Sequence, residues 1–339
     1  MHAEPLGWTP SGGVKILDQT RLPAEEAWIE IADAKSLVEA IVSLRVRGAP
    51  AIGIAAAMGL VAVLRSRTEP RDRAAFLAAV DALAERIEAT RPTAVNLHRA
   101  MERMRRRARA AQGDAAAVLG ELREEAQAVW DEDRAMCEAI AEHGQALMQP
   151  GIHVLTHCNT GALATGGIGT ALGIVLRAAE RGLGPEVWVD ETRPLWQGAR
   201  LTAWELARAG VRHAVLPDSA AATLLAQRKV DVVLVGADRV AWNGDVANKV
   251  GTYPLAVLAR RHGVPFYAVA PTSSFDPECA SGAEIAIEHR GPDEVTAPLG
   301  IRVAPEGCRA FNPAFDVTPA ELVSAYVTER GIVRPPFEE

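Results

Sequence analysis

Residues 156–161, with the sequence THCNTG, bring a thiol, an imidazole, an amide and two hydroxyls into six positions. They follow the apolar run IHVL and precede the glycine-rich run GALATGGIG. A thiol at the end of a strand, close to the start of a glycine-opened helix, meets backbone N–H groups that favour negative charge and can also hold a phosphate. Cys158 is therefore a candidate for chemistry, and a small buried core residue is the alternative.

Other chemistries are weakly indicated. His157 and Cys158 are adjacent and no second Cys/His cluster follows, so the spacing does not predict zinc. The glycines at 167, 169 and 173 miss the dinucleotide fingerprint by one position. No Walker motif and no GxSxG elbow is present. We expect neither a metal nor a cofactor.

A second polar segment covers residues 236–250, GADRVAWNGDVANKV. It carries Asp238, Arg239, Asp245, Asn248 and Lys249 in one connection. That density of charge exceeds what a helix cap needs, whereas Asp218 and Ser219 are equally well explained as a cap. The segment is a candidate part of the same site.

Short apolar runs at 152–156, 186–190, 213–217, 230–236 and 265–270 alternate with helical segments. Strict alternation predicts right-handed βαβ units and a Rossmann-like, mainly parallel, doubly wound α/β sheet. In such sheets ligands bind beyond the carboxyl ends of the strands. The polar residues that follow these runs are therefore expected to meet at one edge.

The N-terminal part has a different pattern. Apolar residues recur every three or four positions within residues 72–90, and residues 114–148 form a second long helical stretch. The turn signal Gln149-Pro150-Gly151 predicts a domain boundary. We expect a mainly helical N-terminal domain, 1–149, and an α/β catalytic domain, 150–339.

Composition narrows the class of protein. Four scattered cysteines among 339 residues suit a reducing cytosol. The net charge of −7 argues against broad nucleic-acid binding, and acidic residues at 121–134 could neutralise the basic run at 99–110. The apolar run at 49–64 is shorter than a membrane span, and the N-terminus lacks the features of a signal peptide. We expect a cytoplasmic protein that binds neither nucleic acid nor membrane.

Six stretches in order also carry a resemblance to a known family. They are LRVRGAPAIGIAAAMG, TRPTAVNL, LTHCNTGALATGGIGTALG, VDETRPLWQGARLTAWEL, VGADRVAWNGDVANKVGTYPLAVLA and NPAFDVTPAEL. With them the chain resembles the methylthioribose-1-phosphate isomerases of methionine salvage over essentially its whole length. The wider superfamily includes ribose-1,5-bisphosphate isomerases and the α, β and δ regulatory subunits of the exchange factor for translation initiation.

The resemblance implies roles for named residues. Cys158 and Asp238 would be the catalytic pair, with Asp238 as proton donor. The substrate-binding residues would be Arg47, Gly48, Ala49, Arg91, Gln197, Asn248 and Lys249. Arg47 and Arg91 come from the helical region, so the site is expected between the domains; by sequence alone both arginines would be taken for surface charges.

The resemblance further implies isomerisation of a small phosphorylated sugar without a cofactor, by a homodimer. Three questions stay open: the 5′ substituent (methylthio, deoxy or phosphate), the hydride-shift or enolate route, and whether the chain is instead a non-catalytic regulatory scaffold. Trp196, next to Gln197, is expected in the core, as a single Trp commonly is.

Overall fold

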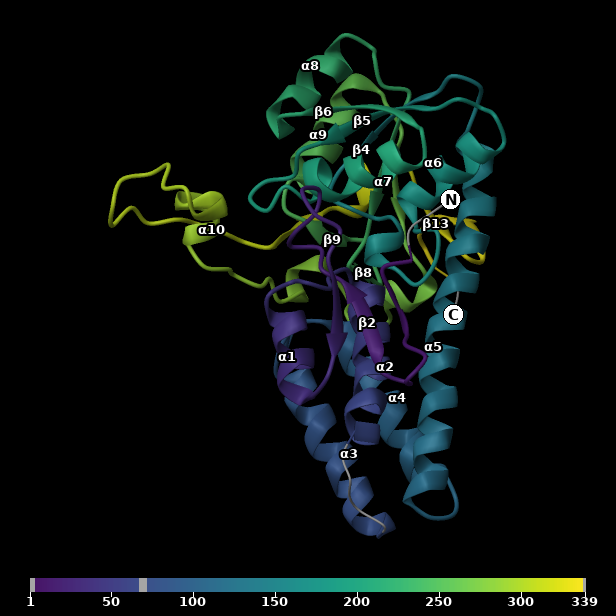
Figure 1. Ribbon diagram of the computed structural model, residues 1–339. Coiled ribbons are helices and arrows are strands. Elements are labelled where there is room, and N and C mark those ends of the chain that lie inside the picture. Colours follow the sequence, from purple (N-terminus) through teal and green to yellow (C-terminus); the bar gives the residue numbers. More distant parts are fainter. Residues whose placement is uncertain (1–3, 67–71, 338–339) are drawn as a thin grey trace. The chain divides into compact units, whose positions relative to one another are not determined.

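The computed structural model describes residues 4–66 and 72–337, and it divides into two compact units (Figure 1). Of the described residues, the helical unit holds 4–66, 72–135 and 162–167. The sheet unit holds 136–161 and 168–337. The two units divide inside a long helix, and the expected boundary at 149/150 lies in the turn after that helix.

The helical unit contains one small sheet and the first helices. Its elements are β1 (Leu6–Trp8), β2 (Val14–Leu17), β3 (Trp28–Ile31), α1 (Ala34–Val42), α2 (Ala49–Ser66), α3 (Arg73–Glu88), α4 (Val95–Ala110) and most of α5 (Ala115–His143). The strands pair antiparallel in the order β1-β2-β3 and were not expected. The apolar spacing behind α3 is confirmed, because Phe76, Val80, Leu83 and Ile87 are all buried.

Helix α2 is the core of this unit. By length and composition it could cross a membrane, which the shorter apolar run at 49–64 did not suggest, but 78% of it is buried inside the unit. It packs against α1, α3 and α4, and a Cβ on Gly59 would lie 2.5 Å from the side chain of Leu37. Burial on all sides accounts for its apolar sequence.

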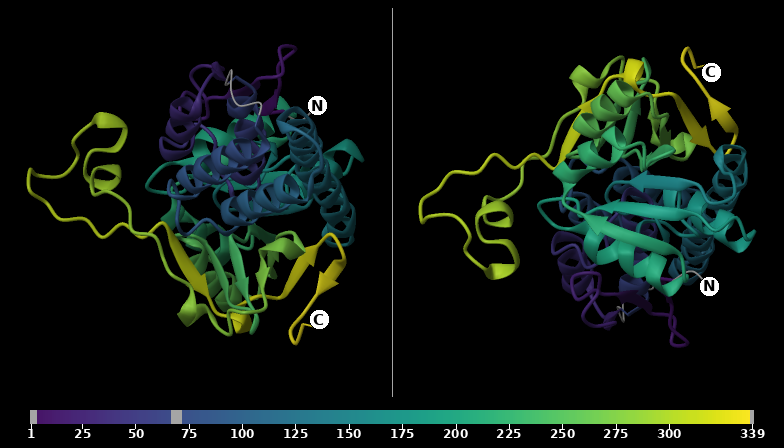
Figure 2. Two further views of the ribbon diagram at one scale, coloured as in Figure 1. Left: turned by 90° about the horizontal axis from the view of Figure 1, so that it is seen from below. Right: turned by 90° about the horizontal axis from the view of Figure 1, so that it is seen from above.

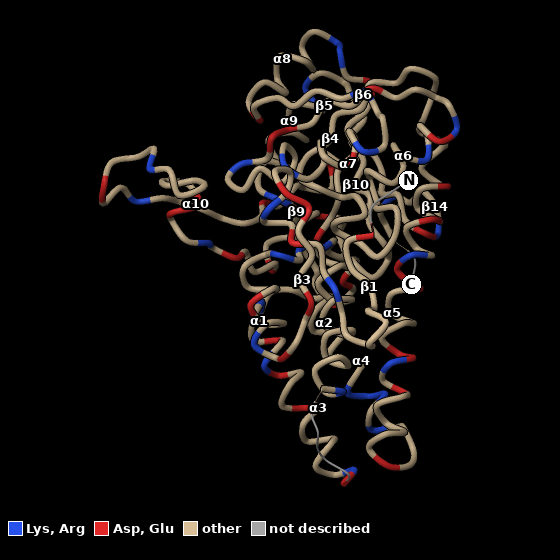
Figure 3. Tube along the Cα trace, in the orientation of Figure 1, with Lys and Arg blue, Asp and Glu red and all other residues tan. Residues whose placement is uncertain are grey.

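Basic residues of α4 are paired with acidic residues of the neighbouring helices; Figure 3 marks the basic and acidic positions along the chain. Arg105 forms a two-point contact with Glu88 of α3, at 2.8 and 2.7 Å. Arg103 contacts Glu125 and Glu132 of α5. The expected neutralisation by residues 121–134 is confirmed for Arg103, whereas Arg105 is neutralised by Glu88 instead.

The sheet unit has a doubly wound sheet. Its elements are β4 (His153–Thr156), α6 (Ala171–Glu180), β5 (Glu186–Asp190), α7 (Ala203–Arg208), β6 (Arg212–Leu216), α8 (Ala221–Ala226), β7 (Val232–Gly236), α9 (Thr252–His262), β10 (Phe266–Val269), β13 (Ala325–Thr328) and β14 (Gly331–Val333). The strand order is β14-β13-β10-β7-β4-β5-β6, parallel except for β14. Without β14 this is the Rossmann order, so the predicted fold is confirmed.

Helices cover the central sheet on both faces (Figure 2), and alternate residues of its central strands belong to two separate cores. Val154 and Leu234 lie in a cluster with α6 and the last turns of α5. Leu155 and Val235 lie in the cluster formed with α8 and α9. Both faces are therefore covered, which explains why the strands read as continuous apolar runs.

A second sheet begins just after the end of β7. Its strands are β8 (Arg239–Ala241), β9 (Val246–Lys249), β11 (Phe275–Asp276) and β12 (Phe315–Thr318), in the order β11-β8-β9-β12. The polar connection at 236–250 is thus an antiparallel hairpin with Gly244 at φ 93° in its turn. An Asn-Gly pair between apolar residues indicates a hairpin. This segment was expected only as a charged connection, and the hairpin was not predicted.

Candidate active site

The two chemically suggestive segments leave the sheet at adjacent strands. Cys158 follows β4 and Asp238 follows β7, and these strands pair directly. The chain continues from β4 toward β5 on one side and from β7 toward β10 on the other. This is the topological switch point, where ligands of doubly wound sheets bind at the carboxyl ends.

Cys158 is buried and has a left-handed backbone, with φ of 64°. Its N–H donates to Oγ1 of Thr192 at 2.8 Å, and its carbonyl accepts from the hydroxyl of Thr202 at 2.6 Å. A left-handed conformation costs a non-glycine residue roughly 1–2 kcal/mol. Strain held by hydrogen bonds on both sides is typical of functional positions.

The hydroxyl oxygen of Thr160 lies at the N-terminus of helix α6. The loop folds back through a bridge between Gly161 and Gly169, and Oγ1 of Thr160 accepts the N–H of Leu172 at 3.1 Å. The carbonyl of Thr160 accepts the N–H of Thr170 at 2.8 Å. The helix-terminus argument made for Cys158 therefore applies more directly to Thr160.

Asp238 is half-buried between β7 and β8. Its N–H donates to the carbonyl of Ala247 at 3.0 Å, and the hairpin pairs Arg239 with Ala247. Continuing that register brings Asp238 opposite Asn248. Arg239 points elsewhere, since its Nε donates to Oδ2 of Asp276 at 2.8 Å.

Asn248 and Lys249 are buried on β9, so they belong to the second sheet and do not follow a strand of the main one. Nδ2 of Asn248 donates to the hydroxyl of Thr252 at 2.9 Å. A Cβ on Gly236 would lie 2.8 Å from Cγ2 of Thr160 and 3.8 Å from Oδ1 of Asn248. The loop after β4 and the hairpin after β7 thus meet over the last residue of β7.

Gln197 comes just before a π-helical turn, η3 (Gly198–Thr202). Its side chain is buried, and Oε1 has no hydrogen-bond partner within residues 4–66 and 72–337. The chain must pass close to β5 here, because a Cβ on Gly198 would lie 1.8 Å from the carbonyl oxygen of Asp190. Buried unpaired acceptors and π-turns are both uncommon and both concentrate at functional sites.

Trp196 is not a core residue, contrary to expectation. Its backbone is left-handed, with φ of 54°, and its ring lies 4.5 Å from the guanidinium of Arg193. With Leu195 and Leu299 it lines a pocket of about 460 Å³ in the sheet unit. The tight turn before η3 turns the indole away from the core.

The remaining candidates belong to the helical unit. Nε of Arg47 donates to Gln19 at 3.3 Å, and Gln19 in turn donates to the carbonyl of Leu163 at 2.7 Å. Gly48 has φ of 95°, and a Cβ there would lie 2.6 Å from Cα of Ala164. Ala49 begins α2, and Arg91 lies in the turn between α3 and α4. The structure thus brings Arg47 and Gly48 to the short segment 162–164.

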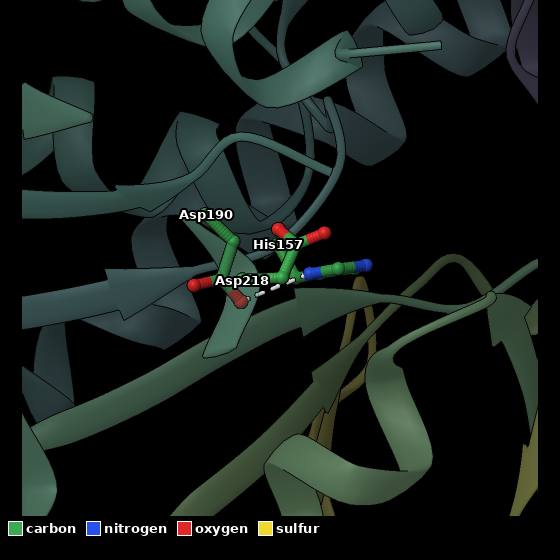
Figure 4. A group of neighbouring side chains, drawn as sticks. All are labelled: His157, Asp190 and Asp218. Atoms are coloured by element: carbon green, nitrogen blue, oxygen red, sulfur yellow. Dashed lines mark hydrogen bonds and ion pairs between the residues drawn. The ribbon is translucent and has the colours of Figure 1, made fainter. Parts of the chain in front are cut away.

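Sequence reasoning missed a group of side chains beside Cys158, formed by the buried His157 and Asp190 and the half-buried Asp218 (Figure 4). Nδ1 of His157 lies 2.9 Å from Oδ2 of Asp190. Asp218 accepts the backbone N–H groups of Thr192 and Arg193 at 2.7 and 2.8 Å, so it holds the loop that follows β5. It is also the first residue of η4 (Asp218–Ala220). Each residue ends a strand of one sheet, and that shared position was the available signal.

The same three side chains have ligand atoms within 4.8 Å of one another, as a metal site would. However, both oxygens of Asp218 already accept N–H groups. Both ring nitrogens of His157 also face protein acceptors, Asp190 and the carbonyl of Val250. The donor set fits a hydrogen-bond network better than a metal site.

Comparison with known proteins places this architecture in a family. The model of the initiation factor 2 subunit family matches residues 45–335. The chain belongs to the initiation factor 2 subunit family. Within it, a methylthioribose-1-phosphate isomerase of Pelotomaculum thermopropionicum is 52% identical over 98% of this chain and 92% of its own. A 5-deoxyribose 1-phosphate isomerase of Moorella thermoacetica is 50% identical over 99% and 95%.

Solved structures of the family agree. The 5-methylthioribose 1-phosphate isomerase of Pyrococcus horikoshii OT3 is 41% identical, with a TM-score of 0.91 over 98% of this chain and 93% of that one. A protein of A. fulgidus described as translation initiation factor eIF-2B, subunit delta, is 39% identical, with a TM-score of 0.88 over 98% and 96%. The resemblance to the isomerases is confirmed at the level of the family.

Proposed function

We propose that this protein converts 5-methylthioribose 1-phosphate to 5-methylthioribulose 1-phosphate. The observation that carries the proposal is that Cys158 and Asp238 follow two directly paired strands, β4 and β7, at the switch point of the sheet, in a chain about half identical to enzymes named for this reaction. The names of these relatives imply that the step belongs to methionine salvage, and we propose that it takes place in the cytoplasm.

The substrate explains why a special site is needed. Its anomeric carbon carries a phosphate ester, so the furanose ring cannot open spontaneously as an ordinary aldose does. The ring oxygen must receive a proton, the ring C–O bond must break, and hydrogen must move from C2 to C1. We propose that Asp238 donates that proton and that Cys158 stabilises the charged transition state.

The binding roles are proposed from chemistry and from the family motif. The unpaired Oε1 of buried Gln197 suits a sugar hydroxyl, since a hydroxyl would satisfy it. Asn248 and Lys249 would bind polar groups of the substrate beside Asp238. Arg47, Gly48, Ala49 and Arg91 are proposed as further substrate-binding residues, with the arginines suited to phosphate.

Two alternatives have specific support. A relative is named for 5-deoxyribose 1-phosphate, so a 5-deoxy sugar is a close rival, and ribose 1,5-bisphosphate is a more distant one that needs further basic groups. A neighbour at 39% identity is described as a translation-factor subunit, which favours a regulatory scaffold. The buried Lys249, and the buried Gln197 whose Oε1 has no hydrogen-bond partner among the described residues, favour a small-molecule site over a scaffold.

Assaying the purified protein with each of the three sugar phosphates, with ketose formation as the readout, tests the proposal. We expect the highest kcat/KM for the methylthio sugar. A higher kcat/KM for one of the other two sugars would identify that sugar as the substrate. If none of the three sugars is converted, the regulatory scaffold is the remaining proposal.

A further inference from the structure

The ring of His157 lies between two acceptors, the carboxylate of Asp190, which Figure 4 shows, and the backbone carbonyl of Val250. It is 0% exposed; Nδ1 lies 2.9 Å from Oδ2 of Asp190, and Nε2 lies 2.9 Å from the carbonyl oxygen of Val250. A carbonyl can only accept, so Nε2 carries a hydrogen. A ring held from both nitrogens has one orientation.

These contacts join three segments of the proposed site. His157 precedes Cys158, Asp190 ends β5 before the loop that contains Thr192, and Val250 follows Lys249. The ring also fills the space beneath the next turn, because a Cβ on Gly251 would lie 2.6 Å from its Cε1. Removing the ring would free the turn after Lys249 and the loop of Cys158 together.

Asp190 holds the Cys158 loop by a second path. Its backbone carbonyl accepts the hydroxyl of Thr192 at 3.0 Å, and the same hydroxyl oxygen accepts the N–H of Cys158 at 2.8 Å. Asp218 in turn holds Thr192 by accepting the backbone N–H of Thr192. The left-handed backbone of Cys158 is therefore held by Thr192, which is itself held by Asp190 and Asp218.

We infer that His157 is a positioning residue for the isomerase reaction: its buried ring, bridging Asp190 and the Val250 carbonyl, sets Cys158 and the Asn248–Lys249 pair in register. The inference rests on the proposed function. His157 would not touch the sugar, since both of its nitrogens are already engaged.

The charges around the ring favour its protonated form. Asp190, Asp218 and Asp316 act on it, and Glu191 acts on Asp190. Burial alone would lower the pKa of His157, but the hydrogen bond and charge of Asp190 outweigh it and raise that pKa. The two contacts of the ring are strongest below that raised pKa and weaken as pH rises through it.

The first test is His157→Gln, with kinetics, thermal unfolding and labelling of Cys158 by iodoacetamide measured by peptide mass spectrometry. We expect kcat/KM to fall by roughly 10²-fold, as for small misplacements of catalytic groups. We also expect Cys158 to be alkylated faster relative to exposed Cys308. The labelling needs no substrate, so it decides the inference even if no sugar is turned over.

The matched control is His153→Gln. His153 begins β4, where His157 follows its end, and it makes a similar contact with Asp231, at 3.2 Å, but is exposed. We expect wild-type kinetics and labelling. If His157→Gln keeps wild-type kcat/KM and Cys158 labelling, or loses only thermal stability, the inference is wrong.

Asp190→Asn decides the case if His157→Gln fails to fold. Asparagine can still pair with Nδ1, through its oxygen when the ring is protonated and through its NH2 group when the ring is neutral. The contact is therefore kept while the charge that favours imidazolium is removed. We expect intermediate activity whose alkaline decline moves to lower pH, because the pKa of His157 falls. An unchanged pH profile and unchanged Cys158 labelling would overturn the inference.

Discussion

At the scale of single residues, Cys158 couples a strained backbone to a buried thiol. Serine tolerates the same φ at the same cost and keeps the size, so Cys158→Ser removes the sulfur alone. An interaction made only in the transition state lowers kcat and kcat/KM together. We expect both to fall by roughly 10²–10³-fold, as when one stabilising donor is lost, with little change in the melting temperature.

Cys308→Ser is the control, because Cys308 is an exposed free thiol. It should match the wild type in rate and stability. If Cys158→Ser loses stability but keeps its specific activity, Cys158 is a structural core residue.

Asp238 must be protonated to act as an acid, although a carboxyl group with a pKa of about 3.9 is ionised at neutral pH. We expect the substrate phosphate and the exclusion of water to favour the protonated form, and Lys249 to oppose it. Arg239 is engaged with Asp276, which weakens the interpretation of Asp238 as its ion-pair partner. We expect Asp238→Asn to lose roughly 10²–10⁴-fold in kcat and to lose the basic limb of the kcat–pH profile.

Asp231→Asn is the matched control, since Asp231 lies exposed at the other end of β7. It should leave the profile unchanged. A near-wild-type rate for Asp238→Asn, with lower stability only, would rule out the acid role.

At this scale the sequence predicted which side chains follow the strands, but not how they are held. Strand ends follow from local patterns, so Cys158 and Asp238 could be predicted at one edge. The left-handed φ of Cys158 depends on Thr192 and Thr202, far along the chain. His157 was missed for the same reason, because its partner Asp190 belongs to the next strand.

At the scale of elements, long periodic segments were predicted well. The five expected strands correspond to β4, β5, β6, β7 and β10. The central parallel strands are buried and carry continuous apolar runs, whereas β6 is a mainly exposed edge strand. The elements that were missed are short: β1 to β3, the β8–β9 hairpin, β11, β12, β13 and the edge strand β14. A strand of two to four residues offers too few positions to show a clear alternation, so the local pattern is weak there.

The π-turn that follows Gln197 depends on one glycine. A Cβ on Gly198 would approach the carbonyl oxygen of Asp190 to 1.8 Å, so the backbone must move. We expect Gly198→Ala to destabilise the protein by about 1–3 kcal/mol, as overpacking does, and to reduce kcat/KM because Gln197 shifts. Denaturant unfolding and substrate kinetics measure the two effects.

Gly120→Ala provides the opposite control. Gly120 is an exposed position of α5, and a Cβ there meets nothing within 4 Å in the described chain. Alanine should stabilise the helix by roughly 0.5–1 kcal/mol. Equal effects of both substitutions would mean that the close approach at Gly198 is unimportant.

At the scale of the whole molecule, the expected homodimer is the last prediction. The segment around α10 (Asp293–Thr296) extends away from the rest of the sheet unit (Figure 1). Beyond α10 it exposes large apolar side chains, with Leu299 76%, Ile301 66% and Phe311 81% exposed. Exposed apolar patches commonly mark interfaces, and two-fold dimers are the commonest oligomers.

We therefore expect light scattering to give twice the 36.1 kDa of one chain. We further expect Ile301→Asp to shift the protein toward the monomer, because a buried carboxylate would be unpaired in the interface. Val42→Asp is the control, since Val42 is 53% exposed on α1 of the helical unit. A wild-type mass of one chain would remove the dimer. A dimer unaffected by Ile301→Asp would place its interface on another surface.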